Sequence, residues 1–512
     1  MPRKMDFGKN RDSNHIQEGN NGTSLRYNLE SNIEFFTHIF NGDETLRIRK
    51  FQNKYFSDVT FCVIYLDGMV NTEIINENII QPIMQNNLFE EISLIQLLEE
   101  LQNKIIVSNN VVKEHDTNKM VRSLISGDTV LFINGYDISL IIDSKGMQMR
   151  SISEPESARV VRGPREGFTE AIMTNLSLIR RIINNQDLKM KFKEIGKRTH
   201  TKTCICYIEG LASTEIITEL EQRLDAIELD AILDSGYIQE LIDDAPFSPF
   251  ETVGYSERPD VIAAKLLEGR IALVVDGSPF VLTVPYILIE GWHANEDYYN
   301  NYIFATFNRL LRMIGAFVAT GLPAIFLAIT CFHQEMLPTP LLISISASRM
   351  GVPFPSIVSL IGMLLVFDII REAGIRMPAP IGQAVNIVGT LVLGQAVVEA
   401  KLISAPVVII TALSGIMTLL SPTMIGIVVL ARFFLLFLSA VMGIYGYIFG
   451  MILIIIHVLN IRSFGVPYLL GMTTVKNHNS QDIWVRVPWW SMTLRPKIIG
   501  AKNLVRQSRK NR

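Results

Sequence analysis

The residues best placed to do chemistry in this chain are polar side chains in an otherwise apolar run, Ile381–Ala400. They are Gln383, Asn386, Thr390, Gln395 and Glu399. At about 1.5 Å per residue the run is long enough to cross most of a hydrocarbon core about 30 Å thick. Polar groups at membrane depth face a bundle interior or water rather than lipid. The run therefore predicts an interior membrane helix that packs against neighbouring helices or lines a conduit.

Helical periodicity divides this run into two opposed faces. The polar face holds Gln383, Asn386 and Thr390, and the other face holds Val385, Val388, Val392, Gln395 and Glu399. The polar face either lines a pore or hydrogen-bonds to neighbouring helices. The valine face either packs against neighbours or forms an apolar constriction that closes a pore by dewetting. We predict a constriction at Val388 and Val392, with Glu399 near an external mouth and the polar face as the alternative lining.

The sequence gives no sign of an enzyme. It lacks a glycine-rich phosphate loop, a His-Glu-x-x-His pair and a nucleophile elbow. Its histidines are dispersed, and Cys204 and Cys206 alternate along a predicted strand, where a core thiol pair is expected rather than a metal site. We therefore predict no catalytic residue, no bound metal and no cofactor.

Composition divides the 512 residues into unlike parts. Only four acidic residues lie between Arg309 and Arg462, whereas residues 1–302 hold most of the acids and have the composition of a water-soluble domain. Residues 484–512 carry eight basic and no acidic residue, which suits an anionic membrane surface or a solvated terminus. Residues 1–22 are polar and show no signal peptide, so the N-terminal domain is expected to stay in the cytoplasm.

Two sequence blocks recur at one offset. Tyr65–Ile75 is matched by Tyr207–Ile217, and Gly127–Gly135 by Gly269–Gly277, in each case 142 residues later. The Asn134-Gly135 pair between apolar runs predicts a β-hairpin. Two separated blocks with one offset indicate two related α/β lobes, for which we expect the same strand order.

Apolar runs predict six membrane spans. They are Ile314–Cys331, Pro355–Ile370, Pro380–Glu399, Pro406–Leu420, Ile425–Val441 and Ile444–Leu459. With the N-terminal domain inside, Arg371, Arg376 and Arg462 also lie inside, in agreement with the positive-inside rule, and the even number returns the C-terminus to the cytoplasm. Arg432 in the fifth span is expected to be paired or to snorkel.

The predicted fold class is a two-lobed α/β cytoplasmic domain with an internal repeat, followed by an all-α polytopic membrane domain of about six helices. The predicted domains are a polar, disordered tail (1–50), α/β lobe 1 (51–145), a linker and helix (146–200), α/β lobe 2 (201–291), an interfacial aromatic and basic segment (292–312), the transmembrane domain (313–462) and a basic cytoplasmic tail (463–512). In the linker, Arg162, Arg165 and Glu166 are either solvated or make ion pairs between lobes or subunits.

Three long motifs resemble the A subunit of GerA-type spore germination receptors. They are EPESARVVRGPREGF at 154–168, EGRIALVVDGSPFVLTVPYILIE at 268–290 and REAGIRMPAPIGQAVNIVGTLVLGQAVV at 371–398. The resemblance implies a multi-pass protein of the spore inner membrane, in contact with lipid and not with nucleic acid, that acts with a transporter-like B subunit and a lipoprotein C subunit. It also implies a homo-oligomer, expected to be a pentamer, that forms a nutrient-gated ion channel and releases cations.

Two alternatives remain, a secondary transporter and a non-conducting scaffold subunit. The predicted spans show no obvious paired halves of the kind transporters use. The repeat lies instead in the soluble part, which favours a regulatory or assembly module on a membrane core.

Overall fold

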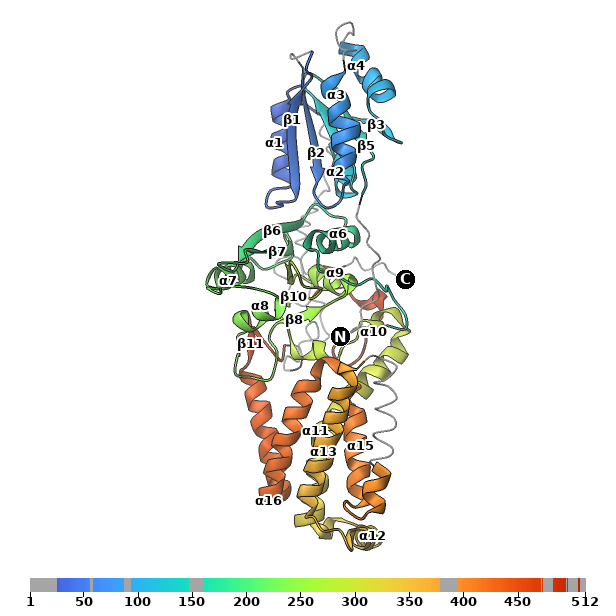
Figure 1. The fold of residues 1–512 in the computed structure, drawn as a ribbon, viewed down its shortest axis with the longest axis vertical. Helices are drawn as coiled ribbons and strands as arrows, with labels where there is room; N and C mark the ends of the chain where they lie inside the picture. Colours follow the sequence, from blue (N-terminus) through green and yellow to red (C-terminus); the bar gives the residue numbers. More distant parts are fainter. Residues whose placement is uncertain are drawn as a thin grey trace, which may run out of the picture. The chain divides into compact units, whose positions relative to one another are not determined.

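The computed structural model describes residues 25–55, 59–86, 94–146, 160–377, 394–470, 472, 482–493, 495 and 505–506. The chain divides into two compact units, Met1–Gln148 with Asn184–Gln186, and Met149–Ile183 with Asp187–Arg512. The first unit contains one α/β lobe. The second unit contains another α/β lobe together with a group of long apolar helices (Figure 1).

The first lobe, residues 25–146, is built on an antiparallel sheet with the strand order β1-β2-β4-β5-β3. Its strands are β1 (Leu46–Gln52), β2 (Thr60–Leu66), β3 (Val111–Glu114), β4 (Thr129–Ile133) and β5 (Ser139–Ile142). Helices α1 (Leu29–Ile39) and α5 (Thr117–Ile125) cover one face, where Phe36 packs on Phe132. The other face is covered by α2 (Thr72–Ile74), η1 (Ile75–Ile80), α3 (Gln81–Gln85), α4 (Leu94–Glu100) and η3 (Leu101–Ile105).

The second lobe, residues 168–292, has the strand order β6-β7-β9-β10-β8. Its strands are β6 (Leu188–Ile195), β7 (Thr201–Ile208), β8 (Gly254–Ser256), β9 (Ile271–Val275) and β10 (Val281–Val284). Helices α6 (Ile172–Ile182) and α9 (Pro259–Leu267) cover one face, which also contains Cys204 and Cys206. Their sulfur atoms lie 3.9 Å apart, so the predicted core thiol pair is confirmed. Helices α7 (Thr214–Asp225) and α8 (Ser235–Ile242) pack on the other face.

The two lobes have the same strand order, which confirms the predicted repeat. The offset of 142 residues holds from β1 and β6 through to β5 and β10. The turn glycines agree as well, because Gly68 and Gly210 have φ of 83° and 78°, and Gly135 and Gly277 have φ of 88° and 85°. These angles belong to the left-handed region, where glycine is favoured because it has no Cβ.

The repeat begins earlier than predicted in both lobes. Residues 1–50 were expected to be a disordered tail, but α1 and most of β1 lie within them, and residues 1–24 fall outside the described part. Leu29, Ile33, Phe36 and Phe40 lie on one face of the α1 segment and are buried, a pattern that the polar composition around them concealed. In the second lobe, α6 and β6 occupy the same places, so this lobe includes much of the expected linker.

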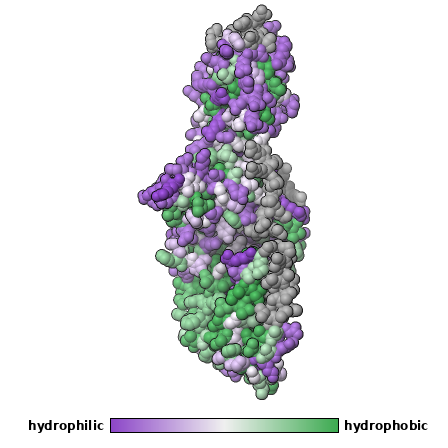
Figure 2. Space-filling model, in the orientation of Figure 1, coloured by the Kyte–Doolittle hydropathy of each residue, from purple (hydrophilic) through white to green (hydrophobic). Residues whose placement is uncertain are grey.

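The apolar helices of the second unit begin before the predicted first span. Helix α11 (Tyr302–Phe332) starts inside the segment 292–312 that was expected to lie separately on the membrane surface; that segment also contains α10 (Glu296–Tyr299). The helices that follow are α12 (Thr339–Arg349), α13 (Ser356–Arg376), a helical stretch at 394–399, α15 (Ala405–Thr418) and α16 (Ile425–Asn460). Tyr302–Phe332 and Pro422–Asn460 are long and apolar enough to cross a membrane by length and composition. Figure 2 shows apolar residues gathered over these helices.

Helix α16 is a hairpin of two arms that meet at Gly443. Gly443 has φ 61° and ψ −138°, which no helical residue adopts. A Cβ on Gly446 would lie 2.1 Å from the carbonyl oxygen of Leu438, eight residues earlier, although a straight helix would separate them by about 12 Å. Val428 and Val458, near the two ends, pack in one core with the second lobe. The arms therefore correspond to the separate fifth and sixth spans of the sequence analysis.

The repeat predicts matched effects of two buried asparagines. Asn32 and Asn175 each accept a hydrogen bond from, and donate one to, the backbone of the residue six positions earlier, Arg26 and Thr169. Replacing either asparagine with alanine should lower the free energy of unfolding by about 1–3 kcal/mol, because buried backbone groups lose their partners. Denaturant unfolding of the full-length protein measures this, with the exposed Asn109→Ala as control. Effects no larger than the control would contradict the shared role.

Candidate functional site: the junction of the second lobe and the apolar helices

Most of the predicted pore residues lie outside the described part of the chain. This holds for Gln383, Val385, Asn386, Val388, Thr390 and Val392. The structure describes Gln395 and Glu399, which are exposed one helical turn apart, and Gln395 Nε2 donates a hydrogen bond to Glu399 Oε1 at 2.8 Å. The assignment of either face to a pore stays a prediction.

The predicted assembly residues lie on an exposed stretch of the second unit. Arg162 and Arg165 are exposed. The carboxylate of Glu166 forms an ion pair with Arg181 of α6. The structure therefore ties Glu166 to its own lobe, and the role of the two arginines between subunits remains a prediction.

A cluster of three charges joins α13 to the first arm of α16. Arg432 is fully buried, and its Nη2 lies 2.5 Å from Asp368 Oδ2. Arg371, one turn further along α13, places Nη1 3.1 Å from Asp368 Oδ1. The expectation that Arg432 is paired is thereby confirmed. The burial of Arg432 would be costly without a counter-charge, and the carboxylate of Asp368 supplies it while also pairing with Arg371.

A second charged cluster lies where α11 begins. Arg309 is fully buried, with Nε 3.4 Å from Asp297 Oδ2 and Nη1 3.2 Å from Asp482 Oδ1. Arg312 also forms an ion pair with Asp297 and donates to the carbonyl oxygen of Trp292 at 2.8 Å. Asp297 belongs to α10, and Asp482 lies in the segment that follows the helices. The cluster thus fastens three separate stretches of chain to one another.

His293 lies beside this cluster in a neutral form. Its Nε2 is 3.2 Å from the carbonyl oxygen of Ile483. Burial, reinforced by the positive charges of Arg309 and Arg312, lowers the pKa of His293 from 6.5 to about 3. At neutral pH the ring is therefore uncharged, and its Nε2–H can donate a hydrogen bond to the Ile483 carbonyl oxygen.

A third group of buried charges lies within the second lobe, between its sheet and the short helix η4 (Leu288–Trp292). Arg270 Nη1 is 2.5 Å from Glu290 Oε1 and donates to the carbonyl oxygen of Pro285 at 2.6 Å. Lys265 Nζ lies 3.3 Å from Glu290 Oε2, and burial lowers the pKa of Lys265. Glu290 therefore connects the sheet to the segment that leads into α10 and α11.

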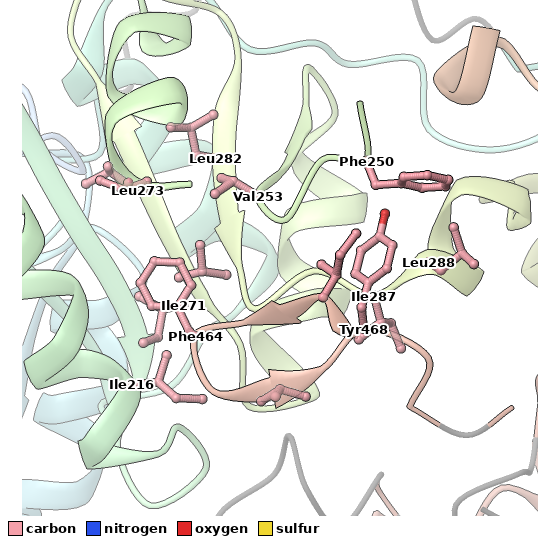
Figure 3. Packing of buried hydrophobic residues seen from close by; sticks show 14 of the residues in the cluster. Ile216, Phe250, Val253, Ile271, Leu273, Leu282, Ile287, Leu288, Phe464 and Tyr468 are labelled. Atoms are coloured by element: carbon pink, nitrogen blue, oxygen red, sulfur yellow. The ribbon is translucent and has the colours of Figure 1, made fainter. Parts of the chain in front are cut away.

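The chain after α16 returns to the second lobe as a two-stranded hairpin, β11 (Arg462–Ser463) and β12 (Val466–Pro467). Ser463 Oγ accepts a hydrogen bond from the Tyr286 amide at 2.9 Å and donates to the Thr252 carbonyl at 2.6 Å. Figure 3 shows Phe464 beside Ile271 and Tyr468 beside Ile287, within one apolar cluster. Both ends of the helix group are thus held by the same lobe.

Sequence reasoning missed the acidic partners in these clusters, Asp297, Glu290 and Asp482. The available signal was the Arg309 and Arg312 pair at the start of an apolar helix, because buried guanidinium groups require partners. In the described part of the chain, no group of three or more His, Cys, Asp or Glu residues could hold a metal ion.

Comparison with known proteins identifies the family. The family described as Bacillus/Clostridium GerA spore germination protein matches residues 34–498. This chain belongs to the GerA family. The match extends over most of the first lobe, the whole second lobe and all the apolar helices, so the junction lies within the shared region.

Named relatives of this GerA-family chain are similar over most of their length. Spore germination protein KA of Bacillus subtilis (strain 168) is 41% identical over 89% of this chain and 83% of its own length. The uncharacterized membrane protein YfkQ of the same strain is 40% identical over 94% and 93%. A crystal structure of the N-terminal domain of the A subunit of the Bacillus megaterium spore germinant receptor GerK3 is 32% identical, with a TM-score of 0.41, over 51% of this chain and 96% of that one.

The charged cluster around Arg432 in this GerA-family chain gives a test of stability. Asp368→Asn would leave Arg432 buried without its counter-charge, so the free energy of unfolding should fall by about 3–5 kcal/mol. The matched control is Glu372→Gln on the same helix, since Glu372 pairs with Arg376 at 2.7 Å with both side chains more than half exposed. Breaking an exposed pair should cost at most about 1 kcal/mol. Unfolding of the detergent-solubilised protein measures both, and equal losses would refute the role of Asp368.

Proposed function

We propose that this chain is a membrane subunit of a nutrient germinant receptor of bacterial spores, and that it oligomerises into a nutrient-gated ion channel. The family and its named spore germination relatives support the receptor assignment. One observation supports gating, namely that the second lobe shares one buried core with the start of α11 and with the chain after α16. The buried ion pairs of Arg309 join α11 to α10 and to the C-terminal segment beside that core. A movement of this lobe is therefore transmitted to the helix ends rather than absorbed by a flexible linker.

The proposed location is the spore inner membrane, with several spans and both termini in the cytoplasm. The proposed partners are further copies of the chain in a pentamer, a transporter-like B subunit, a lipoprotein C subunit and membrane lipid. The apolar helices support the membrane assignment. The two ends of α16 pack on the same lobe, which supports an even number of crossings for its two arms.

The proposed pore face consists of Val385, Val388, Val392, Gln395 and Glu399. The two described members, Gln395 and Glu399, are exposed, as side chains of a pore or of a subunit interface would be in a single copy. Valines at the constriction would exclude water and ions while the receptor is at rest. Gln383, Asn386 and Thr390 form the alternative lining.

Ion flux distinguishes the channel from the alternatives. The purified protein in liposomes should conduct cations when the gate is weakened, whereas a scaffold conducts none and a transporter shows saturable, solute-coupled uptake. Val388→Ala or Val392→Ala should widen the constriction and increase the leak, and a larger side chain at either position should reduce it. If both alanine variants leave the flux unchanged while Asn386→Ala or Thr390→Ala alters it, the pore lies on the polar face.

The assembly proposal concerns the exposed arginines before α6. Replacing both Arg162 and Arg165 with alanine should reduce the oligomeric fraction, because a broken inter-subunit ion pair can cost about 3–5 kcal/mol when it is buried. Size-exclusion chromatography with light scattering in detergent measures the fraction. Arg198→Ala is a suitable control, because Arg198 forms a well-exposed ion pair with Asp230. An unchanged oligomer in the double variant would favour the alternative interpretation, in which these arginines are solvated.

A further inference from the structure

An apolar groove lies where a loop of the second lobe meets the two arms of α16. It has a volume of about 330 Å³. The loop contributes Phe247 and Phe250, the first arm contributes Leu430 and Phe434, and the second arm contributes Leu453. Among the residues that line the groove, His457 alone is polar, and its Nε2 lies 2.8 Å from Ser248 Oγ of the same loop. The walls are therefore hydrophobic, and their one polar pair is already satisfied.

The loop is held firmly while one of its aromatic side chains is left fully exposed. Phe250 is buried, with its ring 5.9 Å from that of His457, and the amide of Ser248 donates to the Ala245 carbonyl at 2.8 Å. Phe247 lies between these anchored residues and has a relative exposure of 103%. A phenylalanine in such a position is unfavourable in water and favourable in an apolar phase.

The groove opens onto the apolar surface of the hairpin. Leu430 and Leu453 line the groove and are also exposed, and Phe437 continues the exposed surface of the first arm two turns after Leu430. This surface belongs to the stretch Pro422–Asn460, which is apolar enough to cross a membrane. The groove is thus continuous with the surface that lipid would cover.

We propose that the groove binds an acyl chain of a membrane lipid and that Phe247 inserts into the same leaflet. A peptide in the groove would need hydrogen-bond partners for its backbone, and the walls offer only the pair that Ser248 and His457 already make. An acyl chain needs no such partner. The inference requires α16 to lie in a membrane but not to conduct ions, so the outcome of the flux experiment does not affect it.

Spin labelling tests the insertion of Phe247. The full-length protein carrying Cys331→Ser, which removes the one exposed cysteine among the four, receives Phe247→Cys and a nitroxide label. After reconstitution into phosphatidylcholine–phosphatidylglycerol vesicles, oxygen should collide with the label more often than a water-soluble nickel chelate does. The control Tyr237→Cys, at a half-exposed residue of α8 in the same lobe, should show the reverse order. Nickel-dominated collisions at both positions would overturn the proposal.

Retained lipid tests the groove itself. Native mass spectrometry of the detergent-solubilised protein should detect bound phospholipid in the wild type, and Ala431→Phe, which fills the groove, should lose it. Val441→Phe adds a similar side chain at an exposed position on the same arm outside the groove and should keep the lipid. Equal lipid in both variants would overturn the proposal. A disulfide between neighbouring copies of the unlabelled Phe247→Cys variant would also overturn it, because position 247 would then face a second copy of the chain rather than lipid.

Discussion

The second unit depends on one buried carboxylate, that of Asp297. It forms ion pairs with Arg309 and Arg312, two guanidinium groups carried by the first turns of an apolar helix. Without a counter-charge the desolvation of these groups would oppose the burial of the helix start. With Asp297 as the counter-charge, the start of α11 can be buried beside the lobe. Asp482 attaches the C-terminal segment to Arg309.

The duplicated lobes use equivalent faces of their sheets in different ways. In the first lobe, α4 and η3 contribute Leu97, Leu98 and Leu101 to the core on one face, so its own chain completes it. In the second lobe, the corresponding face shares its core with residues of the apolar helices and of the chain after them, including Met313, Val458 and Tyr468. The first lobe is therefore self-contained, whereas the second would expose apolar surface if the helices were removed.

Local signals made much of this fold predictable. The turns at Gly68 and Gly135 recur at Gly210 and Gly277, because a few local residues set the glycine conformations that such turns require. The pairing of Arg432 follows from the cost of a charge in an apolar run. Helix α1 was missed because Leu29, Ile33 and Phe36 are spaced among polar residues that dominate the composition. The second acidic partner of Arg309 could not be inferred from spacing, since Asp482 lies 173 residues later and only the folded chain brings the two together. The same holds for Phe247, whose significance depends on its position beside α16.

The turn at Gly443 has a consequence for how the chain would insert into the membrane proposed above. A side chain at position 443 would be strained by the φ of 61° and would press against Phe332 and His333 at the end of α11. The tight turn between the two arms of α16 therefore requires glycine. The first arm carries Arg432, a residue that costs about 2.5–3.5 kcal/mol at the centre of an isolated inserting helix. The second arm, from Ile444 to Asn460, carries no such charge. If the two arms insert together as a hairpin, the apolar second arm offsets the unfavourable transfer of the charged first arm, and Asp368 of α13 supplies the counter-charge in the folded protein.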